Sequence, residues 1–286
     1  MRIVVLAIGL WALSNASCSR TAPPAPSQAP PKAPPQIKVA TIHGQVTRQT
    51  ADGKKILLSA GDLLSAADIV RTEDGTATLE IGGVAAVEVA THTQVSIGEL
   101  TDTLAKVHLS DGRIAAVVHG DEHNSLQIDS LGAVARANVG EFSMLSSGSQ
   151  VSVAALHGQV TLSARGRSVR IGSGQLSLVA RDQAPTPPEA IPASLYLKLG
   201  STHPTTQKER RAVLHGSTAP GAVISINGVR LNADNTGEFT ATIALKEGPN
   251  HLVVDSADTL GRTAHAAWPR ITVDTRAPEA RSKVRW

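Results

Sequence analysis

The stretch IHGQVT, residues 42–47, opens a segment that continues to Leu79 and indicates how this chain folds. The segment passes through GDLLSAADIVRT at residues 61–72 and closes with DGTATL at residues 74–79. Short apolar runs separated by Gly and Asp are typical of β-strands joined by tight turns. The segment therefore predicts a β-rich fold without long helices.

An internal repeat supports this interpretation. The string HGQVT occurs at residues 43–47 and again at residues 157–161. Each copy is followed by a strand that begins at a Gly, and a second Gly follows eight positions later, at residues 53 and 61 and at residues 166 and 174. Similar turn chemistry at equal spacing predicts two similar hairpin units, which we interpret as two halves of one domain.

Further short strands are expected between the two copies. Residues 84–90 and 94–97 have strand character, and residues 106–118 are interpreted as strand, turn and strand, with the turn at 111–113. Residues 166–171 alternate in the way that a strand with one buried and one solvated face does. Many short strands at regular spacing predict a β-barrel, sandwich or roll.

The N-terminus has the pattern of an export signal. Arg2 precedes an apolar run at residues 3–13, and small residues then lead to Cys18. A charged start, a short apolar run and small residues predict a secretory signal peptide. The run is only about half of the roughly 20 residues that a membrane-spanning helix needs. Cys18 is the only cysteine, so no disulfide can form within the chain.

A lone cysteine directly after such a run resembles the lipobox of bacterial lipoproteins, which implies lipidation of Cys18 after cleavage. Asn15 stands where that motif usually has Leu. The alternative is ordinary cleavage near Ala16, which leaves a free and reactive thiol. Within the lipoprotein class, Ser19 implies sorting to the outer membrane. We therefore expect an exported chain in the outer membrane or periplasm, anchored to the membrane through Cys18.

Composition also suggests where the domains begin and end. Residues 21–36 are mostly Pro and Ala, which predicts an extended polyproline II spacer, with a Pro-rich recognition ligand as the alternative. The predicted organisation is a signal peptide at 1–17, a Pro/Ala-rich linker at 18–36, a β-rich domain at 37–183, a linker at 184–208, a second domain at 209–275 and a tail at 276–286.

The β-rich domain resembles the FecR domain, a periplasmic domain named after the regulator of ferric citrate transport. Glu141 stands where the family's A-x-x-x-G-T-x-F stretch has Thr. The resemblance covers about half of the chain and implies a sensing or interaction module. The matching segments are Gly44-x-Val46, residues 61–64, 68–72 and 75–79, residues 134–142, Gly158-Gln159-Val160 and residues 172–175.

One family feature is not expected here. The regulator that gives the family its name has a cytoplasmic segment and a transmembrane helix before this domain, and it acts on a sigma factor. In this chain only Met1 and Arg2 precede the apolar run. We therefore do not expect this chain to control a sigma factor directly.

The second domain is predicted to be a small antiparallel β-sandwich. Asn227-Gly228 between apolar runs is a strong hairpin signal, because both central residues of a type I′ turn need positive φ. Residues 195–199 could form a strand packed on either neighbouring domain. The domain resembles the bacterial Ig-like modules of envelope proteins, through residues 216–222, Asn227-Gly228, 237–239, 247–250 and 258–261.

Few residues suggest chemistry. His119-Gly120-Asp121-Glu122-His123 matches H-x-x-E-H, a zinc-protease pattern that requires both histidines on one helical face. Gly120 and the strand-like flanks predict a hairpin tip instead, which leaves His119 and His123 as weak candidates for binding a metal in a loop.

Other candidates have structural explanations. His43, His157 and His215 each precede a Gly and are interpreted as strand ends that cap turns. Asp234, Asp255 and Asp258 could hold calcium, but the chain has no D-x-D-x-D-G loop. Charged residues are 18% of the chain and the net charge is +3, without a cluster of Lys or Arg for nucleic acid.

The sequence therefore predicts a non-enzymatic envelope protein that needs no cofactor and senses or binds an envelope protein. The first alternative is binding of a cell-wall polymer such as peptidoglycan. Phe142, Tyr196, Phe239, Trp268 and Trp286 are interpreted mainly as core or strand residues, which weakens the sugar-stacking route to such a polymer. The second alternative is a metal-dependent hydrolase. The ligand and the oligomeric state stay open.

Overall fold

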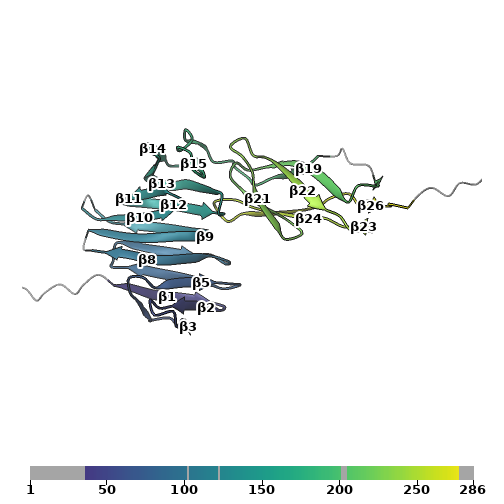
Figure 1. Ribbon diagram of the computed structural model, residues 1–286. Helices are drawn as coiled ribbons and strands as arrows, with labels where there is room; N and C mark the ends of the chain where they lie inside the picture. The colour runs from purple at the N-terminus through teal and green to yellow at the C-terminus, as the bar shows by residue number, and fades with distance from the viewer. Residues whose placement is uncertain (1–35, 102, 122, 201–204, 277–286) are drawn as a thin grey trace, which may run out of the picture. The chain divides into compact units, whose positions relative to one another are not determined.

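The computed structural model describes residues 36–101, 103–121, 123–200 and 205–276 (Figure 1). All regular elements in these ranges are β-strands, which confirms the all-β prediction. The same ranges contain no helix that is long and apolar enough to cross a membrane. The predicted signal peptide, Cys18 and nearly all of the Pro/Ala-rich linker lie outside the described residues.

Strands β1 to β16, which we name the N-terminal lobe, form two sheets that share two strands. Sheet 1 has the order β16-β15-β13-β12-β9-β7-β6-β1-β4, and sheet 2 has the order β3-β2-β5-β8-β9-β10-β11-β13-β14. The strands are β1 (Ile37–His43), β2 (Val46–Gln49), β3 (Lys55–Leu57), β4 (Leu63–Leu64), β5 (Ile69–Thr72), β6 (Thr76–Ile81), β7 (Ala85–Val89), β8 (Gln94–Leu100), β9 (Leu104–His119), β10 (Ser125–Ser130), β11 (Ala133–Ala137), β12 (Val139–Ser146), β13 (Gln150–Ala164), β14 (Arg167–Gly172), β15 (Gln175–Ala180) and β16 (Glu189–Ala190).

Both sheets contribute to one apolar core. The inward side chains alternate with outward ones along most strands, as in β7 and β11. Because Val, Ile and Leu fit a pleated surface, strands of this composition can pack two faces together without large aromatic residues. Phe142 is the one aromatic side chain in this core, and it is fully buried together with Leu109, Ile114 and Met144.

Strand β9 passes from sheet 2 to sheet 1 at a bulge. Its inward positions are odd-numbered up to Leu109 and even-numbered from Gly112 onward, because Ser110 is an extra residue opposite β8. Gly112 has φ +96°. A Cβ there would lie 2.6 Å from the Thr93 Cα. The predicted turn at 111–113 is therefore wrong: the residues form a bend within one 16-residue strand.

Strand β13 passes from sheet 1 to sheet 2 in the same way. Leu156 is the extra residue, and Gly158 follows it with φ +77°. A Cβ on Gly158 would lie 3.0 Å from the Gly140 Cα and 2.8 Å from the Val139 carbonyl oxygen. Only glycine permits this approach of two backbones with that φ.

The first copy of the repeat has the same arrangement. Gly44 connects β1 in sheet 1 with β2 in sheet 2, and its φ is +72°. A Cβ on Gly44 would lie 2.9 Å from the Gly75 Cα. In both copies of HGQVT the Gly is therefore a corner between the sheets, and the Val that follows, Val46 or Val160, enters the core of sheet 2.

The predicted hairpin tip at residues 119–123 is also wrong. Strands β9 and β10 are parallel, with Gln127 opposite Lys106 and Asp129 opposite His108. After β9 has passed into sheet 1, the chain must return to sheet 2 before β10 can begin. The second half of β9 and the loop that contains Gly120 together make this connection, since a parallel pair needs a connection of about a dozen residues or more.

Strands β17 to β26, which we name the C-terminal lobe, form three small sheets around a separate core. Asn227 and Gly228 have φ +47° and +87° in the turn between β20 and β21, as predicted. Strand β17 pairs with β19. The β18–β26 pair is parallel, whereas only antiparallel strands were predicted. The strands are β17 (Leu197–Leu199), β18 (Thr206–Gln207), β19 (Arg211–Thr218), β20 (Val223–Ile226), β21 (Val229–Asn232), β22 (Glu238–Ala244), β23 (Gly248–Asn250), β24 (Val253–Ala257), β25 (Thr263–Ala267) and β26 (Ile271–Val273).

The turn between β24 and β25 contacts the outer face of sheet 1. Ser143 Oγ donates to the Thr259 carbonyl oxygen at 2.5 Å, and the hydroxyls of Ser152 and Thr259 lie 2.5 Å apart. All three residues are buried. The partly buried Leu260 packs against Leu176 and its neighbours on the same face. This contact explains why β13 is buried on both faces between Val151 and Ala155.

The corner at Gly158 should be intolerant of any side chain. Gly158→Ala adds a Cβ in a left-handed conformation, which costs about 1–2 kcal/mol, and overpacking against Val139 and Gly140 should add about 1–3 kcal/mol. Gly166→Ala is the matched control, because Gly166 has φ +72° and open space around it. Urea unfolding of both variants measures the difference; equal losses would contradict the corner packing.

The hydrogen bond between the Ser152 and Thr259 hydroxyls should make a measurable contribution to the free energy of unfolding. Thr259→Val keeps the shape of the side chain but leaves the buried Ser152 hydroxyl without this partner, which should lower the free energy of unfolding by about 1–3 kcal/mol. In a double-mutant cycle with Ser152→Ala, the double variant should lose less than the sum of the two single variants. Strict additivity in urea unfolding would show that the two hydroxyls do not interact.

Candidate functional site

The two histidines of the H-x-x-E-H string do not lie on a helix. His119 is the last residue of β9, His123 lies in the crossing loop, and both side chains are exposed. The Asp121 carboxylate accepts hydrogen bonds from the backbone N–H groups of His123 at 2.8 Å and Asn124 at 3.0 Å. No group of three or more His, Cys, Asp or Glu is placed to hold a metal ion within the described ranges. Asp121 therefore acts as a turn cap.

The carboxylates of the three calcium candidates likewise form hydrogen bonds or ion pairs within their own hairpins. Asp234 Oδ1 accepts hydrogen bonds from the backbone N–H groups of Thr236 and Glu238. Burial raises the pKa of Asp234, but these bonds and the Thr236 hydroxyl lower it more, so its pKa lies below the ordinary value. Asp258 pairs with Arg262 at 2.6 Å, and Asp255 pairs with His265 at 2.5 Å.

The three His-Gly pairs do not form one site. His43 ends β1, as predicted, but His157 and His215 lie inside β13 and β19, so their interpretation as strand ends is wrong. The two strands continue because the Gly after each His serves packing and not a turn. A Cβ on Gly216 would lie 2.4 Å from the Phe239 ring, so that Gly makes room for an aromatic side chain.

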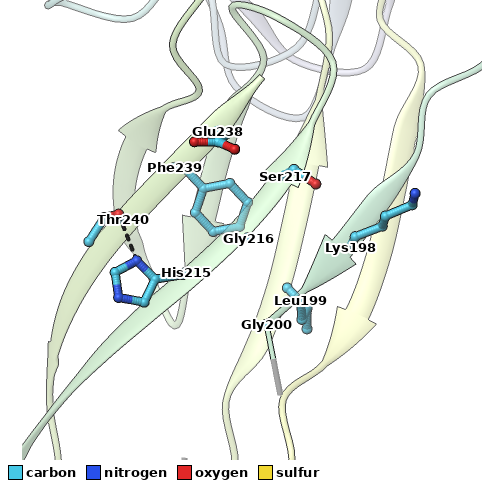
Figure 2. A pocket seen from close by; sticks show the side chains of 9 residues that line it. All are labelled: Lys198, Leu199, Gly200, His215, Gly216, Ser217, Glu238, Phe239 and Thr240. Atoms are coloured by element: carbon cyan, nitrogen blue, oxygen red, sulfur yellow. Dashed lines mark hydrogen bonds between the residues drawn. The ribbon is translucent and has the colours of Figure 1, made fainter. Parts of the chain in front are cut away.

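The space left by the missing side chain of Gly216 is part of a shallow pocket of about 330 Å³ on β17, β19 and β22 (Figure 2). Figure 2 shows Lys198 and Glu238 on its border and the His215 ring turned toward Thr240. His215 Nδ1 lies 3.0 Å from Thr240 Oγ1. The pocket is open to solvent and presents an ammonium, a carboxylate and an imidazole, from Lys198, Glu238 and His215, which are groups that bind polar ligands. The sequence signal was a Gly inside a strand, which often marks a close approach.

A second candidate surface is apolar. Ile56, Leu57 and Leu63 have exposed fractions of 42%, 64% and 49%, and we name these three residues the apolar edge. Strand β3 ends sheet 2 and strand β4 ends sheet 1, so the edges of both sheets lie at this end of the lobe. Arg48 links them, because its guanidinium donates to the Leu63 carbonyl oxygen at 3.0 Å and pairs with Asp68 at 2.9 Å.

Strand β3 pairs only with β2 among the described strands, so its other side presents unpaired backbone groups. Such an edge can accept a further strand from a partner. Lys54 and Lys55 precede the apolar residues. Lysines on an edge disfavour uncontrolled pairing but leave room for a partner with acidic residues. Sequence analysis predicted these residues as strand and had no signal for their position at an edge.

One family model matches part of this chain. The family described as FecR protein matches residues 68–161, which run from the start of β5 into the second half of β13. No curated protein matches the chain. The match agrees with the resemblance expected from the sequence over this part of the chain.

Two similar solved structures both come from Parabacteroides distasonis and are described as candidate anti-sigma factors. Each is 12% identical to this chain. The first has a TM-score of 0.39 and covers 43% of this chain, and the second has a TM-score of 0.31 and covers 55%. The alignments span 59% and 60% of the two solved chains, so this chain matches less than two thirds of either.

The cap in the crossing loop should make stability depend on pH. The His123 N–H donates to the Asp121 carboxylate and holds its pKa below the ordinary 3.8. A carboxyl with a lowered pKa stabilises the fold above its unfolded pKa, and this stability is lost as the pH falls through the folded value. Asp121→Ala should lower the thermal midpoint at pH 7, and the difference from the parent should shrink below about pH 3.8.

The matched control is Glu80→Ala, which removes an exposed carboxylate from β6. That variant should show no such narrowing at low pH. Thermal melts followed by circular dichroism at several pH values measure both. An Asp121→Ala difference that stays constant from pH 7 to pH 2.5 would contradict the role of the charge.

Proposed function

We propose that this chain is a non-enzymatic lipoprotein of the cell envelope whose N-terminal lobe senses a signal by binding another envelope protein. The observation that carries this proposal is the FecR match over residues 68–161. The export pattern at residues 1–18 supports placement in the envelope, and Cys18 would provide the lipid anchor. The predicted spacer at residues 18–36 would separate the anchor from the lobe.

The apolar edge is the surface that best fits a protein partner. Interfaces bury apolar side chains at their centre and keep charged residues at the rim. Leu57 and Leu63 are the most exposed members of the apolar edge, and Lys54 and Lys55 lie beside it. A partner strand with apolar residues and at least one carboxylate would extend sheet 2 at β3 and cover these side chains.

We assign the C-terminal lobe an Ig-like supporting role. Its hairpin at Asn227-Gly228, its alternating strand β22 and its separate core support a comparison with bacterial Ig-like modules. Its contact with Ser143 and Ser152 would hold sheet 1 on the side away from the shared core. In this proposal the pocket of Figure 2 is a secondary recognition surface on that lobe.

The experiment places a photo-crosslinking amino acid at Leu57 of the full chain in a Gram-negative host. We expect discrete protein adducts in the membrane fraction, because a partner strand at β3 would lie within contact distance. The matched control is Val253, which has a similar exposed fraction of 51% but lies on β24. It should give no adduct of the same mass.

The same cells test the anchor. Cys18→Ser should move the chain and its adducts from the membrane fraction to the soluble periplasmic fraction. The proposal fails if Leu57 and Val253 give the same adducts, or if the parent chain is found in the cytoplasm. Loss of adducts in Cys18→Ser alone, with the chain still exported, would show that the partner is reached only from the membrane surface.

A further inference from the structure

A row of long polar side chains crosses sheet 2 on its outer face. The printed register places Lys106 of β9 opposite Gln127 of β10, and Gln127 opposite Arg136 of β11. Arg136 lies opposite Thr161 of β13, and Thr161 lies opposite Arg170 of β14. Five neighbouring strands therefore contribute one residue each to a straight row, which we name the basic row.

The row points away from the core. The residues on either side of each member along its strand are mostly buried: Ala105 and Val107, Leu126 and Ile128, Ala135 and Ala137, Val160 and Leu162. Since successive side chains in a strand point to opposite faces, the row members face solvent. Arg136 and Arg170 are exposed, and Lys106, Gln127 and Thr161 are half-buried.

The three cations are evenly spaced. Lys106, Arg136 and Arg170 occupy the first, third and fifth strands of the row. Neighbouring strands lie about 4.8 Å apart, so adjacent cations lie roughly 10 Å apart and the row is about 19 Å long. Between them lie an amide and a hydroxyl, which can donate and accept hydrogen bonds.

The immediate surroundings leave the two arginines available. Arg136 Nε donates to Ser125 Oγ at 3.2 Å, which orients the guanidinium without neutralising it. Within the described residues no carboxylate forms an ion pair with Arg136 or Arg170. Lys106 pairs with Glu99 at 2.6 Å, but both side chains are partly exposed, and such pairs contribute little and exchange readily.

The neighbouring row is compact. It holds Asp129 paired with His108 at 2.6 Å, and Ser163 with its hydroxyl 2.8 Å from that of Ser168. Serine side chains are much shorter than arginine side chains, so they leave the neighbouring guanidinium groups accessible from the side. The carboxylate of Asp129 contacts the His108 imidazole, and within the described residues it forms no ion pair with a member of the basic row.

We propose that the basic row binds an anionic glycan, an extended polymer whose carboxylates or phosphates recur about every 10 Å or at a divisor of that spacing. Arginine forks bind such groups through two parallel hydrogen bonds, and Gln127 and Thr161 would bind sugar hydroxyls between them. A row without aromatic residues does not supply the stacking platforms that single-stranded nucleic acids use. A glycan that binds through charge and hydroxyl contacts does not need them.

This surface lies on strands far from the apolar edge, so the inference is independent of the protein partner proposed above. The test uses the full chain in a non-ionic detergent. The probes are polygalacturonate, neutral dextran and oligo-dT, and binding is measured by microscale thermophoresis at 20 to 200 mM salt.

We expect polygalacturonate to bind and dextran not to bind. Arg136→Gln with Arg170→Gln should weaken binding at least tenfold at low salt and flatten the dependence of affinity on salt, because fewer counterions are released. Arg136→Lys with Arg170→Lys should weaken binding less than the double Gln variant and preserve the dependence of affinity on salt, because it keeps both charges but loses the paired hydrogen bonds. Arg71→Gln is the matched control, since Arg71 is an exposed arginine on β5 outside the row, and it should change affinity less than twofold.

Three results would overturn the proposal. They are failure of the parent chain to bind polygalacturonate, equal losses for Arg71→Gln and the double Gln variant, and binding of oligo-dT as tight as that of polygalacturonate. Circular dichroism melts show whether each variant is folded, and the double Lys variant keeps the test valid if the double Gln variant unfolds. Crosslinking at Leu57 should be unaffected in the double Gln variant, so the two proposals can fail separately.

Discussion

Close contact between backbones holds the N-terminal lobe together where its strands pass from one sheet to the other. At Gly158 and Gly140 the backbones of two neighbouring strands are so near that a Cβ on either glycine would collide with a carbonyl oxygen. Gly44 and Gly75 repeat the arrangement, and Gly112 meets Thr93 in the same way. Because the corners are this tight, the two sheets face each other across one core that Val, Leu, Ile and Ala can fill with only one buried Phe.

The parts of the fold that sequence analysis predicted correctly depend on neighbouring residues. The turn at Asn227-Gly228 requires positive φ at two successive positions, and these two residue types adopt it most readily. Asp111-Gly112 has similar local chemistry, yet it is a bulge, because Gly112 packs on Thr93 and β9 continues along another sheet. A single sequence does not show whether such a pair forms a tight turn or a bulge, because that depends on packing against residues far away in the chain.

The candidate surfaces were less predictable than the strands for the same reason. Lys106 and Arg170 belong to one row only through the register of five strands, of which β11 and β13 are neighbours in the sheet but not consecutive in the chain. Buried Ser143 and Ser152 both form hydrogen bonds to Thr259, which lies 116 and 107 residues later. The H-x-x-E-H pattern assumes that both histidines share one helical face, whereas His119 ends β9 and His123 lies in the loop that follows it.

Strands β9 and β13 belong to both sheets, and this limits how the lobe could be transplanted into another protein. The FecR match at residues 68–161 omits β1 to β4 at one end and β14 and β15 at the other. Those strands supply Ile37, Val39, Leu64, Ile171 and Val179 to the same core. A graft cut at the limits of the match would remove core strands from both sheets, so the smallest portable unit is larger than the matched segment.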